Sequence, residues 1–223
     1  MSAREAILKK VRGSLHASPE DGARREAVEK RLSSPPRGII PARGQLGDEE
    51  RVALFCKMAE KVSASVQRVG SAEDVPAAVA DYLRAKNLPA SVRMGADPRL
   101  QLMPWAEMKS LEIRNGKAGY EDEVGVSHAS VGVAETGTVA MFSGADNPTT
   151  VNFLPEHHIV VVDAKDIAGD LESVMSRVRD KFGKGQMPRT LNFITGPSRS
   201  GDIEQKLLLG AHGPRALHLI VVG

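Results

Sequence analysis

Apolar residues at helical spacing predict two helices at the start of the chain. Residues 2–16 place most of their apolar side chains on one helical face, and Ser2 and Glu5 have the spacing of a capping box. A second helix is predicted to begin at residues 18–21, where a proline stands in the first turn. The following residues, 33–47, contain three prolines and three glycines, which indicates an extended linker.

We therefore predict an N-terminal helical arm and linker at residues 1–47 and an α/β domain at residues 48–223. Residues 1–48 carry ten Lys and Arg against six Asp and Glu. This excess indicates either a solvated helical arm or a surface for an acidic partner. The arm is expected to pack on the domain itself, on a second copy of the chain in a homo-oligomer, or on another protein.

From residue 48 onward, segments with helical spacing alternate with short apolar segments typical of strands. The predicted helices are 48–65, 71–86 and 166–182. The predicted strands are 66–69, 91–95, 159–163, 191–194 and 217–222, and β-type apolar residues also lie on both sides of position 135. Residues 147–152 are predicted to be a loop. This alternation predicts an α/β fold with a doubly wound, mostly parallel sheet that carries helices on both faces.

The stretch from residue 191 to residue 215 contains the strongest candidate for a binding site. After the strand, a glycine-bearing loop rich in hydroxyl groups leads into a helix that we predict from residues 200–202 to Gly210. A helix N-terminus presents N–H groups and a positive dipole end, which favours an anionic ligand. The candidate contacts in this loop and in the next turn are Thr195, Gly196, Ser198, Arg199, Ser200, His212, Gly213 and Arg215.

Glu135 is the candidate catalytic residue. It is a carboxylate between apolar segments, and it needs partners because burying an unpaired charge is costly. A structural contact could satisfy it, or it could reach a cleft as a base, metal ligand or nucleophile. In the second case Thr136, Gly137 and Thr138 would line the same cleft. We expect Glu135 and the two turns to converge in one polar cavity.

Two adjacent histidines precede a predicted apolar strand. Adjacent side chains in an extended chain point to opposite faces, so only one of His157 and His158 is expected to face a site. With His128, Glu135 and His212 they supply atoms that bind metals. No pair has tight ligand spacing, so no metal site is predicted.

Composition excludes several classes of protein. A hydrophobic content of 41% and a charged content of 26% are typical of a globular protein, and a net charge of +2 is too small to indicate nucleic-acid binding. No run approaches the about 18 apolar residues of a membrane-spanning helix, and the N-terminus lacks a signal-peptide core, so we expect a cytoplasmic protein. The single cysteine, Cys56, excludes an internal disulfide and a self-contained cysteine-ligated cluster. We expect no cofactor in this chain.

Three motifs in order resemble the lactate utilization protein C family. They are Ala134–Thr138, Leu154–His158, and the two turns TGPSRSGDIE and GAHGPR between residues 195 and 215, and they lie within about the last 100 residues. The resemblance implies a fold shared with CoA transferases and ribose-5-phosphate isomerase, with ligands at the carboxyl ends of strands. It also implies a role in oxidising L-lactate to pyruvate, together with partner proteins that carry iron–sulfur clusters.

Two other functions stay open. One is a stand-alone enzyme similar to CoA transferases, in which Glu135 attacks an acyl group and residues 198–200 hold a phosphate or carboxylate. The other is a non-catalytic scaffold or ligand-sensing module. Members of the family often carry an arginine shortly before the Leu-Pro motif, whereas residues 147–150 contain none. Arg199 or Arg215 must then replace that arginine, or the ligand differs.

Overall fold

The computed structural model of the protein describes residues 2–18, 21–36, 38–201 and 207–223. The chain divides into two compact units, Met1–Ile39 and Ile40–Gly223. In the described ranges, no helix combines the length and apolar character needed to cross a membrane.

The first unit consists of helices α1 (Ala3–Ser14) and α2 (Gly22–Ser33). The predicted capping box is present, because Ser2 Oγ accepts a hydrogen bond from the Glu5 N–H at 3.2 Å and the Glu5 carboxylate accepts from the Ser2 N–H at 2.7 Å. None of the described residues of either helix is buried. What the arm packs against therefore stays a prediction.

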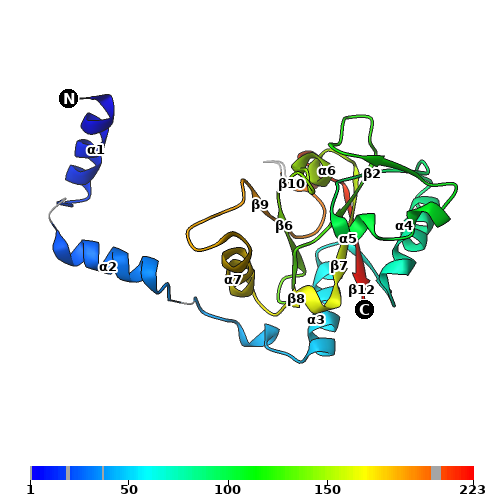
Figure 1. The fold of residues 1–223 in the computed structure, drawn as a ribbon, viewed down its shortest axis with the longest axis horizontal. Coiled ribbons are helices and arrows are strands. Elements are labelled where there is room, and N and C mark those ends of the chain that lie inside the picture. The colour runs from blue at the N-terminus through cyan, green and yellow to red at the C-terminus, as the bar shows by residue number, and fades with distance from the viewer. Residues whose placement is uncertain (1, 19–20, 37, 202–206) are drawn as a thin grey trace. The chain divides into compact units, whose positions relative to one another are not determined.

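A six-stranded sheet with only parallel strand pairs forms the centre of the second unit (Figure 1). In spatial order its strands are β1 (Ser65–Val69), β12 (Ala216–Val222), β7 (His157–Asp163), β4 (Val124–His128), β2 (Ser91–Met94) and β3 (Glu112–Asn115). The central strands β7 and β12 pair over seven residues and are almost wholly buried. The predicted α/β fold with a mostly parallel sheet flanked by helices is confirmed.

Alternate side chains of β7 enter separate hydrophobic cores. Ile159 and Val161 pack with helix α4 (Val75–Ala85) on one face of the sheet. Val160 and Val162 pack with helix α3 (Asp48–Lys61) on the opposite face. Burial on both faces explains why this strand is apolar throughout rather than at every second residue.

A second sheet, which the sequence did not predict, shares the α3 side of the central sheet. In spatial order its strands are β8 (Ile167–Ala168), β5 (Val131–Val133), β6 (Thr138–Phe142) and β9 (Leu191–Ile194). Val139 and Met141 of β6 enter the core that includes α3, whereas Ala140 and Phe142 enter a third core with helix α7 (Leu171–Phe182). Figure 1 shows α4 and α7 on opposite sides of the central strands, with β6 on the α7 side.

Several predicted segments differ in part from the structure, and the helix predicted at 48–65 ends at Lys61. The helix predicted at 166–182 is helical only from α7 onward, where Asp170 Oδ1 accepts the Ser173 N–H at 2.9 Å, and the preceding residues form β8. The loop predicted at 147–152 contains the short helix α6 (Thr149–Phe153). The remaining short elements are α5 (Pro98–Gln101) and the 3₁₀ helices Ala42–Gly44, Ala72–Asp74, Trp105–Glu107 and Ala164–Asp166.

The helix predicted from residues 200–202 to Gly210 is wrong. The described residues form an antiparallel pair of strands, β10 (Arg199–Gly201) and β11 (Leu207–Leu209), and the part of the prediction on residues 202–206 lies outside the described residues. A short apolar run such as residues 207–209 fits a helix or a strand equally well. No helix begins in this described loop, so the helix dipole predicted to attract an anion is absent there.

Residues 40–47, predicted as part of the linker, belong to the second unit and pack against its other residues. Gln45 Nε2 donates to Asp170 Oδ2 at 2.9 Å. The backbones of Gly44 and Gly169 touch so closely that a Cβ on either residue would lie 2.1 Å from the carbonyl oxygen of the other. Side chains at these two positions would push the segment away from α7.

Candidate functional site

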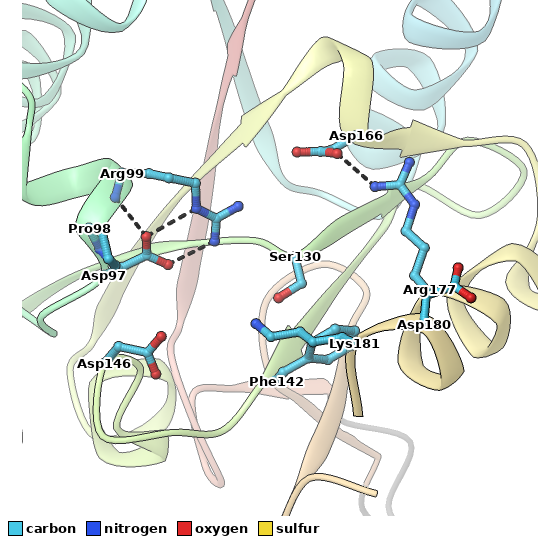
Figure 2. Close-up of a pocket in the computed structure, with 10 residues that line it drawn as sticks. All are labelled: Asp97, Pro98, Arg99, Ser130, Phe142, Asp146, Asp166, Arg177, Asp180 and Lys181. Carbon is cyan, nitrogen blue, oxygen red and sulfur yellow. Dashed lines mark hydrogen bonds and ion pairs between the residues drawn. The ribbon is translucent and has the colours of Figure 1, made fainter. Parts of the chain in front are cut away.

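The carboxyl edge of the parallel sheet contains a cleft of about 660 Å³. Strands β4 and β2 are neighbours in this sheet. The chain continues from β2 to β3 on one side of the pair and from β4 to β7 on the other side, so the direction of strand addition reverses between β2 and β4. Open α/β sheets commonly bind ligands at such a switch point. Figure 2 shows the lining residues, including Asp97 after β2, Ser130 after β4 and Asp166 after β7.

The charged groups in this cleft mostly satisfy one another. The Asp97 carboxylate accepts from Arg99 Nε at 3.0 Å and from Arg99 Nη2 at 2.7 Å, and Arg177 Nη1 donates to Asp166 at 2.7 Å (Figure 2). Burial raises the pKa of Asp97, but the hydrogen bonds and charge of Arg99 outweigh burial and hold that pKa below its usual value. Lys181 Nζ lies 5.4 Å from the centre of the Phe142 ring, within cation–π range. No predicted ligand contact lines this cleft.

The two predicted turns instead meet around a smaller cavity of about 280 Å³. The Ser198 N–H donates to the Pro214 carbonyl at 2.8 Å, and the Gly210 N–H donates to the Ser198 carbonyl at 3.0 Å, so backbone hydrogen bonds join the turns. Seven of the predicted ligand contacts line the cavity: His158, Thr195, Gly196, Ser198, Arg199, His212 and Gly213. His158 and Leu217 reach it from the amino ends of β7 and β12, opposite to the carboxyl ends that the family resemblance implied.

A cluster of three buried polar side chains lies at this cavity. Ser127 Oγ donates to Asn152 Oδ1 at 2.7 Å and lies 3.1 Å from His158 Nε2. Asn152 and His158 both line the cavity, and each is only 1% exposed. Asn152 Nδ2 and His158 Nδ1 have no hydrogen-bond partner among the described residues. Because buried polar atoms are normally paired, this cavity is the better candidate for a ligand site than the self-paired cleft.

Burial also determines the charge of His158. It lowers the pKa of this side chain to about 3, so the imidazole is neutral at physiological pH. Sequence reasoning selected His158 but missed Asn152, because the segment containing Asn152 was predicted as a loop rather than as α6. The only sequence signal was its position just before the Leu154–Pro155 pair.

The predicted separation of the two adjacent histidines is present in the structure. His157 points to the α4 face, where its Nδ1 lies 2.9 Å from the Tyr82 hydroxyl. His158 lies on the α3 side and lines the cavity. Only one of the pair is therefore available to this site.

Several other predicted contacts lie outside the cavity. The hydroxyls of Thr136 and Thr138 are 2.7 Å apart, and Thr138 is 2.7 Å from the Thr195 hydroxyl, so they join the 134–137 turn to the loop beside the cavity. Ser200 lies in β10, and Arg215 Nη1 contacts Glu156 at 3.4 Å on the surface. These residues support or flank the loops rather than line the cavity.

Arg199 lines the cavity but also holds the end of α3. Its Nη2 donates to the Val62 carbonyl at 2.7 Å and to Ser63 Oγ at 2.5 Å. Carbonyl groups at a helix C-terminus lack partners within the helix, and a guanidinium satisfies them well. Arg199 therefore has a structural role in addition to any contact with a ligand.

Glu135 does not line the cavity, so the expected convergence with the two turns is not found. Its Oε1 accepts the N–H of Leu171 at 3.1 Å, at the start of α7, and its Oε2 lies 3.8 Å from Arg43 Nη2. The residue is 4% exposed. A carboxylate at a helix N-terminus is stabilised by the helix dipole, so these contacts hold α7 against the 134–137 turn.

Replacing Glu135 with glutamine is expected to change the free energy of unfolding by less than about 1 kcal/mol, since the amide oxygen still accepts the Leu171 N–H and the exposed Arg43 contributes little. Alanine leaves that N–H without its acceptor and is expected to cost about 1–3 kcal/mol. Denaturant unfolding checks both values. A glutamine variant that folds normally yet loses ligand binding would show that Glu135 acts in the site.

The candidate metal ligands do not assemble. Among the described residues, no group of three or more His, Cys, Asp or Glu side chains is placed to hold a metal ion. His128 is buried at the end of β4, 3.8 Å from Asp163, away from the cavity that His158 lines.

Curated relatives share part of this chain. It is 36% identical over 114 residues to lactate utilization protein C of Geobacillus thermodenitrificans (strain NG80-2), across 51% of this chain and 48% of that protein. It is 35% identical over 109 residues to lactate utilization protein C of Bacillus subtilis (strain 168), across 48% of this chain and 45% of that protein. The alignments therefore span less than half the length of these relatives.

A solved structure supports the fold, and a family model shows the family. The crystal structure of a DUF162 family protein from Deinococcus radiodurans superposes with a TM-score of 0.60 at 21% identity, covering 80% of this chain and 99% of that one. The model of the LUD domain matches residues 52–222, which include the parallel sheet and the cavity between the two turns. The chain therefore belongs to the LUD domain family.

Proposed function

We propose that this chain is a cytoplasmic component of an L-lactate utilization system, which oxidises L-lactate to pyruvate together with iron–sulfur partner proteins. The names of the relatives support the substrate. The single Cys56 supports the assignment of the iron–sulfur clusters to partner proteins, because such clusters are commonly held by several cysteines. Electron transfer would then take place in the partners, and this chain would bind the small carboxylate.

The observation that carries the proposal is the cavity with its two unpartnered polar atoms. Its volume of about 280 Å³ is at the small end of ligand pockets, which suits a short acid rather than a nucleotide. Ser198, Arg199 and His212 line it, and their side chains carry hydrogen-bond donors suited to a carboxylate. Unpartnered buried groups are stabilised once a ligand pairs with them.

The geometry favours this proposal over a CoA-transferase-like enzyme. That mechanism needs the Glu135 carboxylate to reach an acyl group, whereas Glu135 is 4% exposed and bonded to the start of α7. We therefore propose no catalytic role for Glu135.

Growth on L-lactate tests the proposed function. We expect that deletion of the gene in the source organism abolishes growth on L-lactate but not on pyruvate, and that the wild-type gene restores it. Affinity purification of the full chain from lactate-grown cells is expected to recover proteins that carry iron–sulfur clusters. Normal growth of the deletion strain on L-lactate would rule the proposal out.

A further inference from the structure

We propose that Asn152 and His158 make the cavity selective for 2-hydroxy acids over 2-oxo acids and over acids with no substituent. The selectivity arises because these two buried side chains, which both contact Ser127, leave one hydrogen-bond donor and one acceptor without a partner. The inference rests on the proposed function for its choice of L-lactate as the probe. The choice of Asn152 and His158 rests on the geometry of the cavity and not on the proposed function.

The hydrogen-bond directions at the base of the cavity follow from Asn152. Its Oδ1 can only accept, so the Ser127 hydroxyl donates its single proton to that atom, at 2.7 Å. Ser127 Oγ must then accept from His158 Nε2, 3.1 Å away, and Nε2 carries the imidazole proton. In a neutral imidazole the other nitrogen, Nδ1, is an acceptor.

One hydrogen-bond acceptor and one hydrogen-bond donor therefore remain unpaired. His158 Nδ1 can accept a hydrogen bond and Asn152 Nδ2 can donate one, and neither has a partner among the described residues. Both side chains line the cavity, and both contact the same Ser127 hydroxyl through their other polar atoms, Asn152 Oδ1 and His158 Nε2. A ligand satisfies both unpaired atoms only if it carries a donor and an acceptor.

A 2-hydroxy acid has this pair of groups on adjacent carbons. Its hydroxyl can donate to His158 Nδ1 while its carboxylate accepts from Asn152 Nδ2. A 2-oxo acid presents an acceptor to His158 in place of the hydroxyl, and propionate presents a methylene group. Both leave His158 Nδ1 buried without a partner, which is the circumstance that gives sites their strongest discrimination.

A second buried histidine shows which feature matters. His218 is 5% exposed, its Nδ1 lies 2.8 Å from Ser65 Oγ, and its Nε2 also lacks a partner among the described residues. It does not line the cavity, and its ring stacks on Tyr82 with 4.4 Å between the ring centres. His218 is therefore a matched control, with a similar serine contact but no access to the ligand.

Calorimetric titration of the full-length protein tests the selectivity. We expect L-lactate to bind at least about tenfold more tightly than pyruvate or propionate, and glycolate, which keeps the hydroxyl but lacks the methyl group, to retain most of the preference. Equal affinities for the three-carbon acids, or no binding of any of them, would overturn the inference.

Two substitutions separate His158 from its control. We expect His158→Phe to lower L-lactate affinity to that of propionate while leaving propionate binding unchanged, and His218→Phe to keep the preference. Where His158→Phe fails to fold, ¹⁵N NMR of the wild-type imidazoles replaces it. The Nδ1 resonance of His158 should be that of an unprotonated nitrogen and should move on adding L-lactate but not propionate. A protonated Nδ1, or an equal response to both acids, would contradict the inference.

The inference and the proposed function can fail separately. Selective binding by the purified protein, combined with normal growth of the deletion strain on L-lactate, would leave the site intact and remove the function. Loss of growth without any selectivity would support the function and remove the assignment of Asn152 and His158.

Discussion

Replacing Gly137 with alanine is expected to lower the melting temperature of the protein by roughly 6–12 °C. Gly137 has φ of +65°, which costs a residue with a Cβ about 1–2 kcal/mol. The new Cβ would also lie 2.2 Å from the backbone N of Ala59, where real Cβ contacts stay beyond 3.0 Å. Helix α3 would have to move, and the total cost is expected to reach about 3 kcal/mol.

Gly185 provides the control, because it has φ of +77° and a Cβ added there would have nothing within 4 Å. Gly185→Ala therefore measures the cost of the backbone conformation without a collision, and a drop of roughly 2–8 °C is expected. Differential scanning calorimetry of both variants gives the comparison. Equal melting temperatures would show that α3 does not pack against the 134–137 turn as described.

The same packing explains two glycines that the sequence suggested as ligand contacts. Gly196 has φ of +73°, and a Cβ there would lie 2.2 Å from the Val62 carbonyl oxygen, just beyond α3. Gly137 and Gly196 thus let two separate turns approach α3. Gly196 also lines the cavity, so α3 and the residues just after it support one wall of the candidate site.

Local pattern was sufficient wherever burial alone determined the structure. The strands at 159–163 and 217–222 are mostly apolar because both faces of the central sheet are covered. The apolar residues that α3 carries at helical spacing lie in the core on its side of the sheet, as that spacing predicts. The opposite directions of His157 and His158 follow from strand geometry, without knowledge of their neighbours.

The site depended on contacts that local pattern does not contain. The partner of Glu135 is the N–H of Leu171, which is 36 residues further along the chain. Strands β10 and β11 are defined by their pairing with each other, which a run of three leucines does not specify. Asn152 matters because α6 places it beside Ser127, 25 residues earlier in the sequence.

Acid is expected to destabilise the protein well above the pH at which its carboxylates titrate. Burial lowers the pKa of His158 to about 3 and that of His218 to about 4, from about 6.5 in the unfolded chain. Below pH 6.5 these two histidines bind protons in the unfolded state but stay neutral in the folded state, so the free energy of unfolding falls as the pH falls. Each histidine contributes about 1.4 kcal/mol per pH unit, and the two together about 4 kcal/mol between pH 7 and pH 5.

Urea unfolding at a series of pH values between 7 and 4.5 measures this loss. Three buried carboxylates lose their contribution only below this window, because Asp97, Asp122 and Asp170 have pKa values below their usual 3.8. The variant His218→Gln should remove the part of the slope that His218 contributes while keeping the contact with Ser65 through its amide. A free energy of unfolding that stays constant from pH 7 to pH 5 would mean that both imidazoles are protonated in the folded protein, and the acceptor assigned to His158 Nδ1 would be lost with it.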